Sequence, residues 1–178
     1  MTDTEIPSGK NVHDSQADGS ARASVPESPV SGPETRFEAT AAWKGDAMGS
    51  GGLRIGEGEI EIPIAGAREL GGAGGAGNPE ELLLGALAAC FVNTWAIFLK
   101  KLQVAYVEPA VRVTGRLGPD PAGGFRLTGA VVHARVPRTL LSSEGPKVEK
   151  TLQLAEKYCI ISKVARASMP VKVEIEAV

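Results

Sequence analysis

Residues 78–90 read NPEELLLGALAAC, and the rest of the chain is organised around this stretch. Asn78 belongs to the residue types that cap a helix start, and proline is tolerated at the first helical position, where Pro79 would stand. Glu81 occupies the place of the second half of a capping box. The stretch therefore predicts a helix that begins at residue 79 and carries Cys90.

The body of this helix is apolar on nearly every side. No residue from Leu82 to Leu99 is charged, and Lys100 and Lys101 follow with charges suited to a helix C-terminus. In a soluble protein such a helix is buried against neighbours on several sides. The run is also long enough to span a membrane, but glycine, alanine and polar residues dilute its hydrophobicity, so we favour a core helix.

Composition narrows the class of protein. The chain has 178 residues and a net charge of −2, enough for one domain and a tail. No Lys/Arg cluster is longer than a pair, so we expect no nucleic-acid partner. The acidic start, with Asp3 and Glu5, does not resemble a secretory signal, and we expect a cytoplasmic protein with no membrane partner.

The first 35 residues differ in composition from the remainder. They are rich in Ser, Pro, Gly and acidic residues and contain few large apolar side chains. Such a segment cannot bury enough surface to offset its chain entropy. We therefore predict a disordered tail over residues 1–35, in which His13 has no function, and a folded domain over residues 36–178.

Short alternating segments follow the tail. Residues 37–43 and 60–64 alternate apolar with polar or small side chains, as strands do, and Leu53–Ile55 is a short strand after a turn at Gly49–Gly52. These segments predict an antiparallel meander. The glycine-rich run Gly71–Gly77 fits neither nucleotide-binding fingerprint, so we interpret it as a flexible or close-packed lead-in to the helix rather than a phosphate site.

The C-terminal half predicts a hairpin, a second helix and a last strand. Residues 111–117 alternate, a loop follows at 118–124, and the apolar parity switches near Gly129, which indicates a bulge. His133 falls on the polar parity, so a surface histidine is favoured over a ligand. The spacing of apolar residues from Pro146 to Tyr158 predicts a helix with Cys159 at the end of its buried stripe, and residues 171–177 alternate as a final strand. The order indicates an α+β domain with helices packed on an antiparallel sheet.

The chain has two cysteines, Cys90 and Cys159. Neither has the local Cys or His partner that a zinc finger needs, so we expect no metal site. Free cysteine is among the most buried residue types, and spacing alone favours inert core packing for both thiols.

Three motifs reverse that preference. Residues 78–83 (NPEELL), 88–91 (AACF) and 155–159 (AEKYC), with Ile161-Ser162 after them, resemble the osmotically inducible protein C and organic hydroperoxide resistance (OsmC/Ohr) family. The resemblance spans residues 37–178 and is nearer to the general OsmC branch. It implies an intertwined homodimer that reduces organic hydroperoxides, and hydrogen peroxide less well, with two cysteines, an external thiol reductant and no bound cofactor.

The resemblance also implies roles for individual residues. Cys90 would attack the peroxide and become a sulfenic acid, and Cys159 would resolve it as a disulfide. The attack needs a thiolate, yet Cys90 lies inside an apolar helix where no helix N-terminus can help, so we expect a cation to be brought to it. Arg68 is the first candidate for the family's arginine and Arg54 the second, while Glu80 matches the acidic residue that positions it.

Helix geometry adds a constraint on Glu80. It precedes Cys90 by ten residues, about 15 Å along a helix, which is too far for both to act at one site of one subunit. We therefore expect Glu80 to serve the site of the partner chain in a homodimer. Family members usually carry proline after the second cysteine, where this chain has Ile160, which puts resolution in question more than attack. The alternative function is a non-enzymatic protein of the same fold that binds a hydrophobic ligand.

Overall fold

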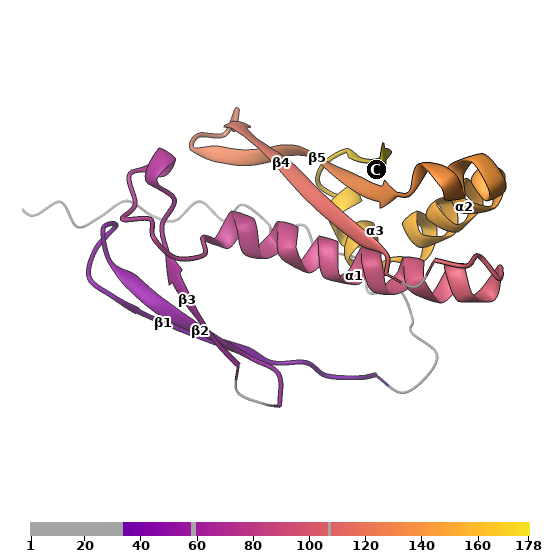
Figure 1. Cartoon of the computed structure of the whole chain (residues 1–178). Helices are drawn as coiled ribbons and strands as arrows, with labels where there is room; N and C mark the ends of the chain where they lie inside the picture. The colour runs from indigo at the N-terminus through magenta and orange to yellow at the C-terminus, as the bar shows by residue number, and fades with distance from the viewer. Residues whose placement is uncertain (1–33, 58–59, 107) are drawn as a thin grey trace, which may run out of the picture. The chain divides into compact units, whose positions relative to one another are not determined.

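The computed structural model describes residues 34–57, 60–106 and 108–178 (Figure 1). The predicted tail, apart from its last two residues, and His13 lie outside the described residues, so the tail and the domain boundary at residue 35 stay predictions. The elements are β1 (Ala39–Lys44), β2 (Ser50–Ile55), β3 (Ile60–Ala65), the 3-10 helix η1 (Arg68–Leu70), α1 (Pro79–Lys101), β4 (Ala110–Pro119), β5 (Phe125–Val136), α2 (Arg138–Tyr158), α3 (Ile160–Arg166) and β6 (Val171–Ala177). The α+β class predicted from the sequence is confirmed.

The first three strands form the predicted antiparallel meander, in the order β1-β2-β3. The prediction of a turn at Gly49–Gly52 is wrong, because β2 already begins at Ser50. A side chain at Gly51 would overlap the carbonyl oxygen of Ala42 on the neighbouring strand. These glycines therefore allow two backbones to approach closely rather than turn the chain.

The glycine-rich run before α1 is folded back on itself. The N–H of Gly74 donates to the carbonyl oxygen of Gly66 at 3.0 Å, and the N–H of Gly72 donates to that of Ala67 at 2.9 Å. A side chain at Gly72 would overlap the Gly66 backbone. The sequence left open whether this run is flexible or close-packed, and the structure shows that it is close-packed.

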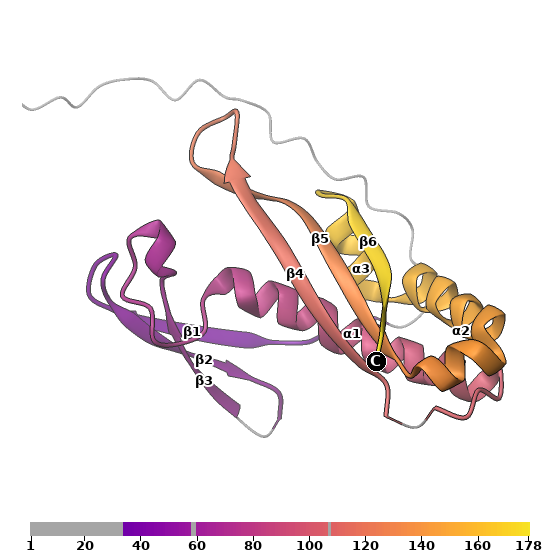
Figure 2. The same ribbon diagram turned by 45° about the horizontal axis from the view of Figure 1, so that its top comes forward.

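The last three strands form a second sheet in the order β4-β5-β6, seen side by side in Figure 2. The register of β4 against β5 shifts between Arg116, which faces Gly129, and Leu117, which faces Leu127, so the predicted bulge is confirmed. The pairing of β5 with β6 is parallel, not antiparallel as expected. Two helices lie between these strands in the chain, and a connection of that length lets the second strand run in the same direction as the first.

Helix α1 begins as its sequence predicts. Asn78 Oδ1 accepts the N–H of Glu81 at 2.8 Å, and Glu81 Oε2 accepts the N–H of Asn78 at 3.3 Å. Both halves of the capping box are therefore present, with Pro79 at the first position.

Only one stripe of α1 is buried within this chain. Leu87, Phe91, Trp95 and Leu99, spaced by four residues, face the second sheet and α2, whereas Leu83 and Ile97 are 45% and 46% exposed. The expectation of burial on several sides is thus not met by a single chain, which supplies neighbours for one face of the helix. By length and composition α1 could also cross a membrane, but core helices of soluble proteins pass the same criterion.

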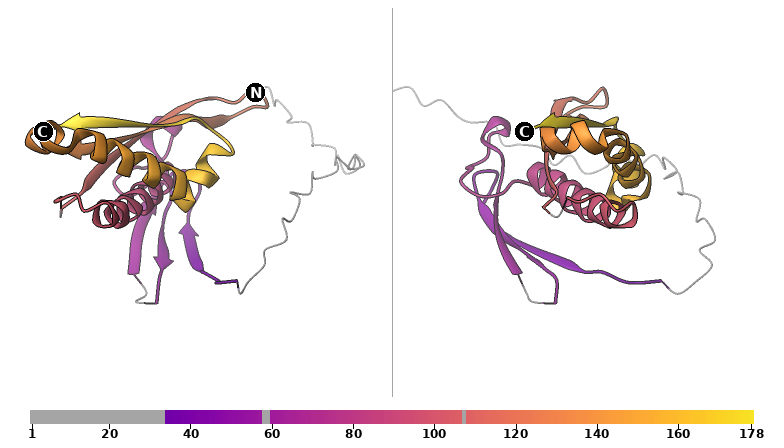
Figure 3. Two further views of the ribbon diagram at one scale, coloured as in Figure 1. Left: turned by 90° about the vertical axis from the view of Figure 1, so that its right-hand side faces the viewer. Right: turned by 45° about the vertical axis from the view of Figure 1, so that its right-hand side comes forward.

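Helix α2 is longer than predicted and bent. It begins at Arg138 rather than Pro146, and Glu144, with φ −134° and ψ 22°, interrupts its helical geometry just before the proline. A short helix, α3, follows Cys159 directly. Figure 3 shows α1, α2 and α3 on one side of the β4-β5-β6 sheet. The core lies between these layers and includes Val132, Ala134 and Val136 of β5 with Val148, Leu152 and Ala155 of α2.

Candidate functional site

The two cysteines come from different elements and meet in the core. Cys90 lies in the middle of α1 and is partly buried, while Cys159 joins α2 to α3 and is fully buried. Each thiol is among the groups that shift the pKa of the other. Two free thiols separated by 69 positions in sequence are therefore neighbours in the fold.

Cys90 is the more acidic thiol of the pair. Burial raises its pKa, but hydrogen bonds to the sulfur outweigh burial and bring the pKa below the ordinary thiol value. The donors are the backbone N–H of Ile161, which contributes most, then the Cys159 thiol and the N–H of Ile160. A pKa lowered by hydrogen bonds means that the thiolate form of Cys90 is favoured.

Thr94 contributes least to the acidity of Cys90, although it stands one turn further along α1. Its hydroxyl donates to the carbonyl oxygen of Cys90 at 2.7 Å. A hydroxyl has one hydrogen to donate, so that bond competes with donation to the sulfur.

Cys159 has the opposite character. Burial raises its pKa, and the N–H and hydroxyl of Ser162, which lower it, do not compensate. Its sulfur accepts the N–H of Ser162 at 3.3 Å and so caps the start of α3. The two thiols therefore differ in acidity, with Cys90 the more acidic and Cys159 the less acidic.

One expectation about Cys90 was that no helix start could help this thiol and that a cation must be brought to it. In one chain the backbone N–H groups of Ile161 and Ile160, at the start of α3, are among the causes that lower its pKa, and α3 packs against α1. No charged side chain of the described residues is one of these causes, so the expected cation stays a prediction.

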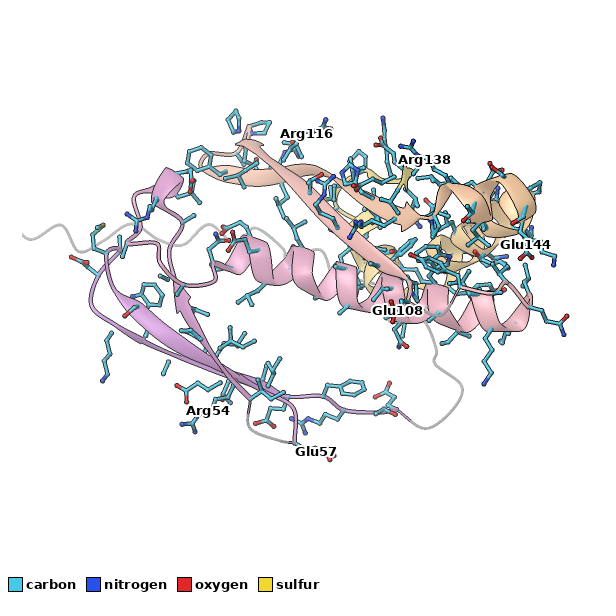
Figure 4. All side chains as sticks on the ribbon, viewed as in Figure 1. Arg54, Glu57, Glu108, Arg116, Arg138 and Glu144 are labelled. Atoms are coloured by element: carbon cyan, nitrogen blue, oxygen red, sulfur yellow. The ribbon has the colours of Figure 1, made fainter. Side chains whose placement is uncertain are left out.

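The two candidate arginines do not join the thiol pair within this chain. Arg68 lies on η1 with an exposed side chain. Arg54 lies on β2, where Figure 4 labels it at the surface of the first sheet, 3.8 Å from Glu61. The structure of one chain therefore leaves both without a contact to Cys90.

Glu80 lies in the first turn of α1, nearly three turns before Cys90 along the helix. Its Oε2 atom is buried and makes no hydrogen bond to any described residue. Buried carboxylate oxygens normally accept a hydrogen bond. The described part of one chain provides no donor for this atom.

Sequence reasoning missed the groups that act on Cys90. Thr94 was detectable, because residues four apart share a helix face. The N–H groups of Ile160 and Ile161 were not, because a backbone donor leaves no mark in the side-chain pattern. Among the described residues no cluster of His, Cys, Asp or Glu is suited to hold a metal ion.

The fold and the site together define the class of this protein. It is a small α+β protein with two neighbouring thiols, one on a central helix and one after a second helix. The family described as OsmC-like protein matches residues 72–174. This match covers more than half of the sequence and includes both cysteines, so the chain belongs to the OsmC family.

Individual relatives agree with this assignment. An organic hydroperoxide resistance protein-like 1 of Staphylococcus epidermidis is 36% identical over 105 residues, which cover 59% of this chain and 73% of that protein. The crystal structure of an organic hydroperoxide resistance protein from Legionella pneumophila is similar at a TM-score of 0.65 and 26% identity, over 80% of this chain and 99% of that one. An OsmC-like protein from Mycoplasma pneumoniae, at 18% identity and a TM-score of 0.65, covers 82% of this chain and 99% of its own and supports the fold alone.

Proposed function

We propose that this protein is a thiol-dependent peroxidase that reduces organic hydroperoxides, and hydrogen peroxide less well. The observation that carries the proposal is the proximity of two free thiols, of which Cys90 has the lowered pKa and Cys159 the raised one. The names of the relatives, organic hydroperoxide resistance proteins, support the substrate class.

The proposed cycle has three steps. The Cys90 thiolate attacks one oxygen of the peroxide, the O–O bond breaks, and the alcohol leaves with a proton while Cys90 becomes a sulfenic acid. The sulfur of Cys159 then attacks the Cys90 sulfur, which releases water and forms the Cys90–Cys159 disulfide. Two equivalents of an external thiol reduce this disulfide by exchange and restore both cysteines.

The proximity of the thiols supports the second step. A disulfide requires sulfur atoms about 2 Å apart, and two thiols that already influence each other's pKa are neighbours in the fold. Ile160, which stands where the family usually has proline and which we expected to affect resolution more than attack, leaves that expectation a prediction.

A homodimer is part of this proposal. The faces of α1 that carry Leu83 and Ile97 are uncovered in one chain, and a second copy would bury them. We place Glu80 of each chain at the thiol site of its partner, together with an arginine, Arg68 first and Arg54 second. A monomer with full peroxidase activity, by sedimentation and turnover measured on one sample, would contradict this arrangement.

We also propose a cytoplasmic location, where thiol reductants are available.

The peroxidase is tested by treating the reduced protein with one equivalent of cumene hydroperoxide and counting free thiols. We expect rapid loss of both thiols and release of one equivalent of the alcohol. If both thiols persist, the alternative function, binding of a hydrophobic ligand without reaction, is the one to retain.

A further inference from the structure

The shortest ion pair among the described residues joins two helix ends on either side of Cys159. Arg166, in the last turn of α3, lies with its Nη2 atom 2.6 Å from Oε1 of Glu156, in the last turn of α2. Its Nη1 atom also donates to the main-chain carbonyl oxygen of Glu156 at 3.1 Å. These two side chains are 31% and 36% exposed, whereas each other ion pair of the described residues includes a side chain that is more than half exposed. One guanidinium group therefore holds a carboxylate and a backbone group at once, partly shielded from solvent.

This ion pair closes a ring of the chain around Cys159. Helix α2 ends where the Cys159 N–H donates to the carbonyl oxygen of Ala155 at 2.8 Å, and Cys159 itself has φ −60° and ψ 117°, so the helical path is interrupted there. Helix α3 follows, and the Arg166 side chain at its end returns to Glu156. The Cys159 side chain is fully buried within this turn of the chain.

Helix α3 is the part of the ring that covers the Cys159 thiol. Its buried residues are Ser162 and Ala165, the backbone nitrogen of Ser162 lies 3.3 Å from the Cys159 sulfur, and the helix packs against α1. A helix of seven residues is not stable by itself, so α3 stays in place only through its contacts with the rest of the protein. The pair with Glu156 is the one ion pair that α3 makes among the described residues.

We propose that Arg166 is a positioning residue: its grip on Glu156 is a clamp that holds α3 closed over Cys159 and so reserves this thiol for Cys90. Cys90 is only partly buried and is open to a peroxide, whereas Cys159 is fully buried and is shielded from solvent. The inference rests on the proposed role of Cys159 in resolution. It adds that the resolving thiol is protected from direct oxidation, and from mixed disulfides with external thiols, while the clamp is closed.

The test measures how fast iodoacetamide alkylates each thiol of the reduced full-length protein at one fixed pH, with peptide mass spectrometry to separate Cys90 from Cys159. Arg166→Gln removes the charge of the clamp, so α3 should open more often and Cys159 alkylation should rise at least about tenfold, while Cys90 alkylation changes less than about threefold. Arg166→Lys keeps a positive charge and a donor and should give a smaller rise. A folded Arg166→Gln protein with the wild-type Cys159 rate would overturn the proposal.

Lys163→Gln is the matched control, because it removes a positive charge from an exposed position of the same helix. It should leave the Cys159 rate within about twofold of wild type. Repeating the alkylation in low urea separates local opening from global unfolding, because opening of α3 alone exposes little surface and should depend only weakly on urea. An equal rise of both thiols in Arg166→Gln, with the urea dependence of global unfolding, would contradict a local clamp.

A second pair of variants keeps the test decisive if Arg166→Gln does not fold. Glu156→Gln removes the carboxylate charge but keeps the main-chain carbonyl that Arg166 also holds, so Cys159 alkylation should rise by a smaller factor. Glu149→Gln, at an exposed position of the same helix, is its control and should not change the rate. Equal Cys159 rates in these two variants would also overturn the proposal. Because no peroxide is used, failure of the peroxidase proposal would not change these results.

Discussion

The indole Nε1 of Trp95 donates a hydrogen bond of 2.9 Å to Oγ1 of Thr151, and both side chains are fully buried. Thr151 Oγ1 in turn donates to the carbonyl oxygen of Val148 on its own helix. This bond joins α1, which carries Cys90, to α2, which leads to Cys159. The alignment of the two helices is therefore held by a polar contact as well as by apolar packing.

Replacing Thr151 by valine keeps the shape of the side chain and removes the acceptor. The Trp95 N–H would then be buried without a partner, which costs about 1–3 kcal/mol of unfolding free energy. Urea unfolding measures the loss. Thr139→Val, at an exposed position of the same helix, is the control and should change stability by less than about 0.5 kcal/mol. Equal effects of the two variants would show that the hydrogen bond does not hold the helices.

Loss of the helix cap is a second prediction on stability. Asn78→Ala removes the acceptor for the Glu81 N–H and should cost about 1 kcal/mol, whereas Asn78→Ser keeps a capping oxygen and should cost less. Thermal or urea unfolding followed by circular dichroism compares the two. A serine variant as unstable as the alanine variant would argue against the cap.

The two thiols should titrate in a fixed order. Because the pKa of Cys90 is lowered and that of Cys159 is raised, the Cys90 thiolate forms first as the pH rises. Alkylation of each cysteine, normalised to its plateau rate and followed by peptide mass spectrometry, should give a lower midpoint for Cys90. The reverse order would remove the assignment of Cys90 as the attacking thiol.

Substitution of each cysteine separates attack from resolution. Cys90→Ser should abolish consumption of cumene hydroperoxide, because no thiolate remains in contact with the substrate. Cys159→Ser should allow one turnover and leave a Cys90 sulfenic acid, which dimedone traps. Multiple turnovers by Cys90→Ser at the wild-type rate would disprove the proposed mechanism.

The last prediction concerns Glu80, whose buried Oε2 atom has no hydrogen-bond partner among the described residues of one chain. If Glu80 positions a cation at the partner's site, Glu80→Gln should lower kcat/KM for the hydroperoxide at least about tenfold, since a hydrogen bond to a charged group contributes about 1.5–3 kcal/mol. Glu81→Gln is the matched control from the same turn, because glutamine also completes a capping box. Comparable losses in both variants, or none in either, would contradict the role.

Local features of the fold were predictable. The start of α1, the antiparallel meander and the bulge near Gly129 each depend on residues close together in sequence, so their signals are complete in a short window. The turn at Gly49–Gly52 was mispredicted because a glycine that permits close strand contact looks the same in sequence as one in a turn. The parallel pairing of β5 with β6 was missed because alternation shows a strand but not its direction.

The sequence by itself determined where the thiol-bearing helix begins, that Cys90 lies in its interior and that Cys159 ends a second helix. Only the tertiary structure decided which thiol is the more acidic. Desolvation and hydrogen bonding to a sulfur depend on what the folded chain places around it, and here the donors are backbone groups about 70 residues away along the chain. These groups stand at the start of α3, which packs against α1.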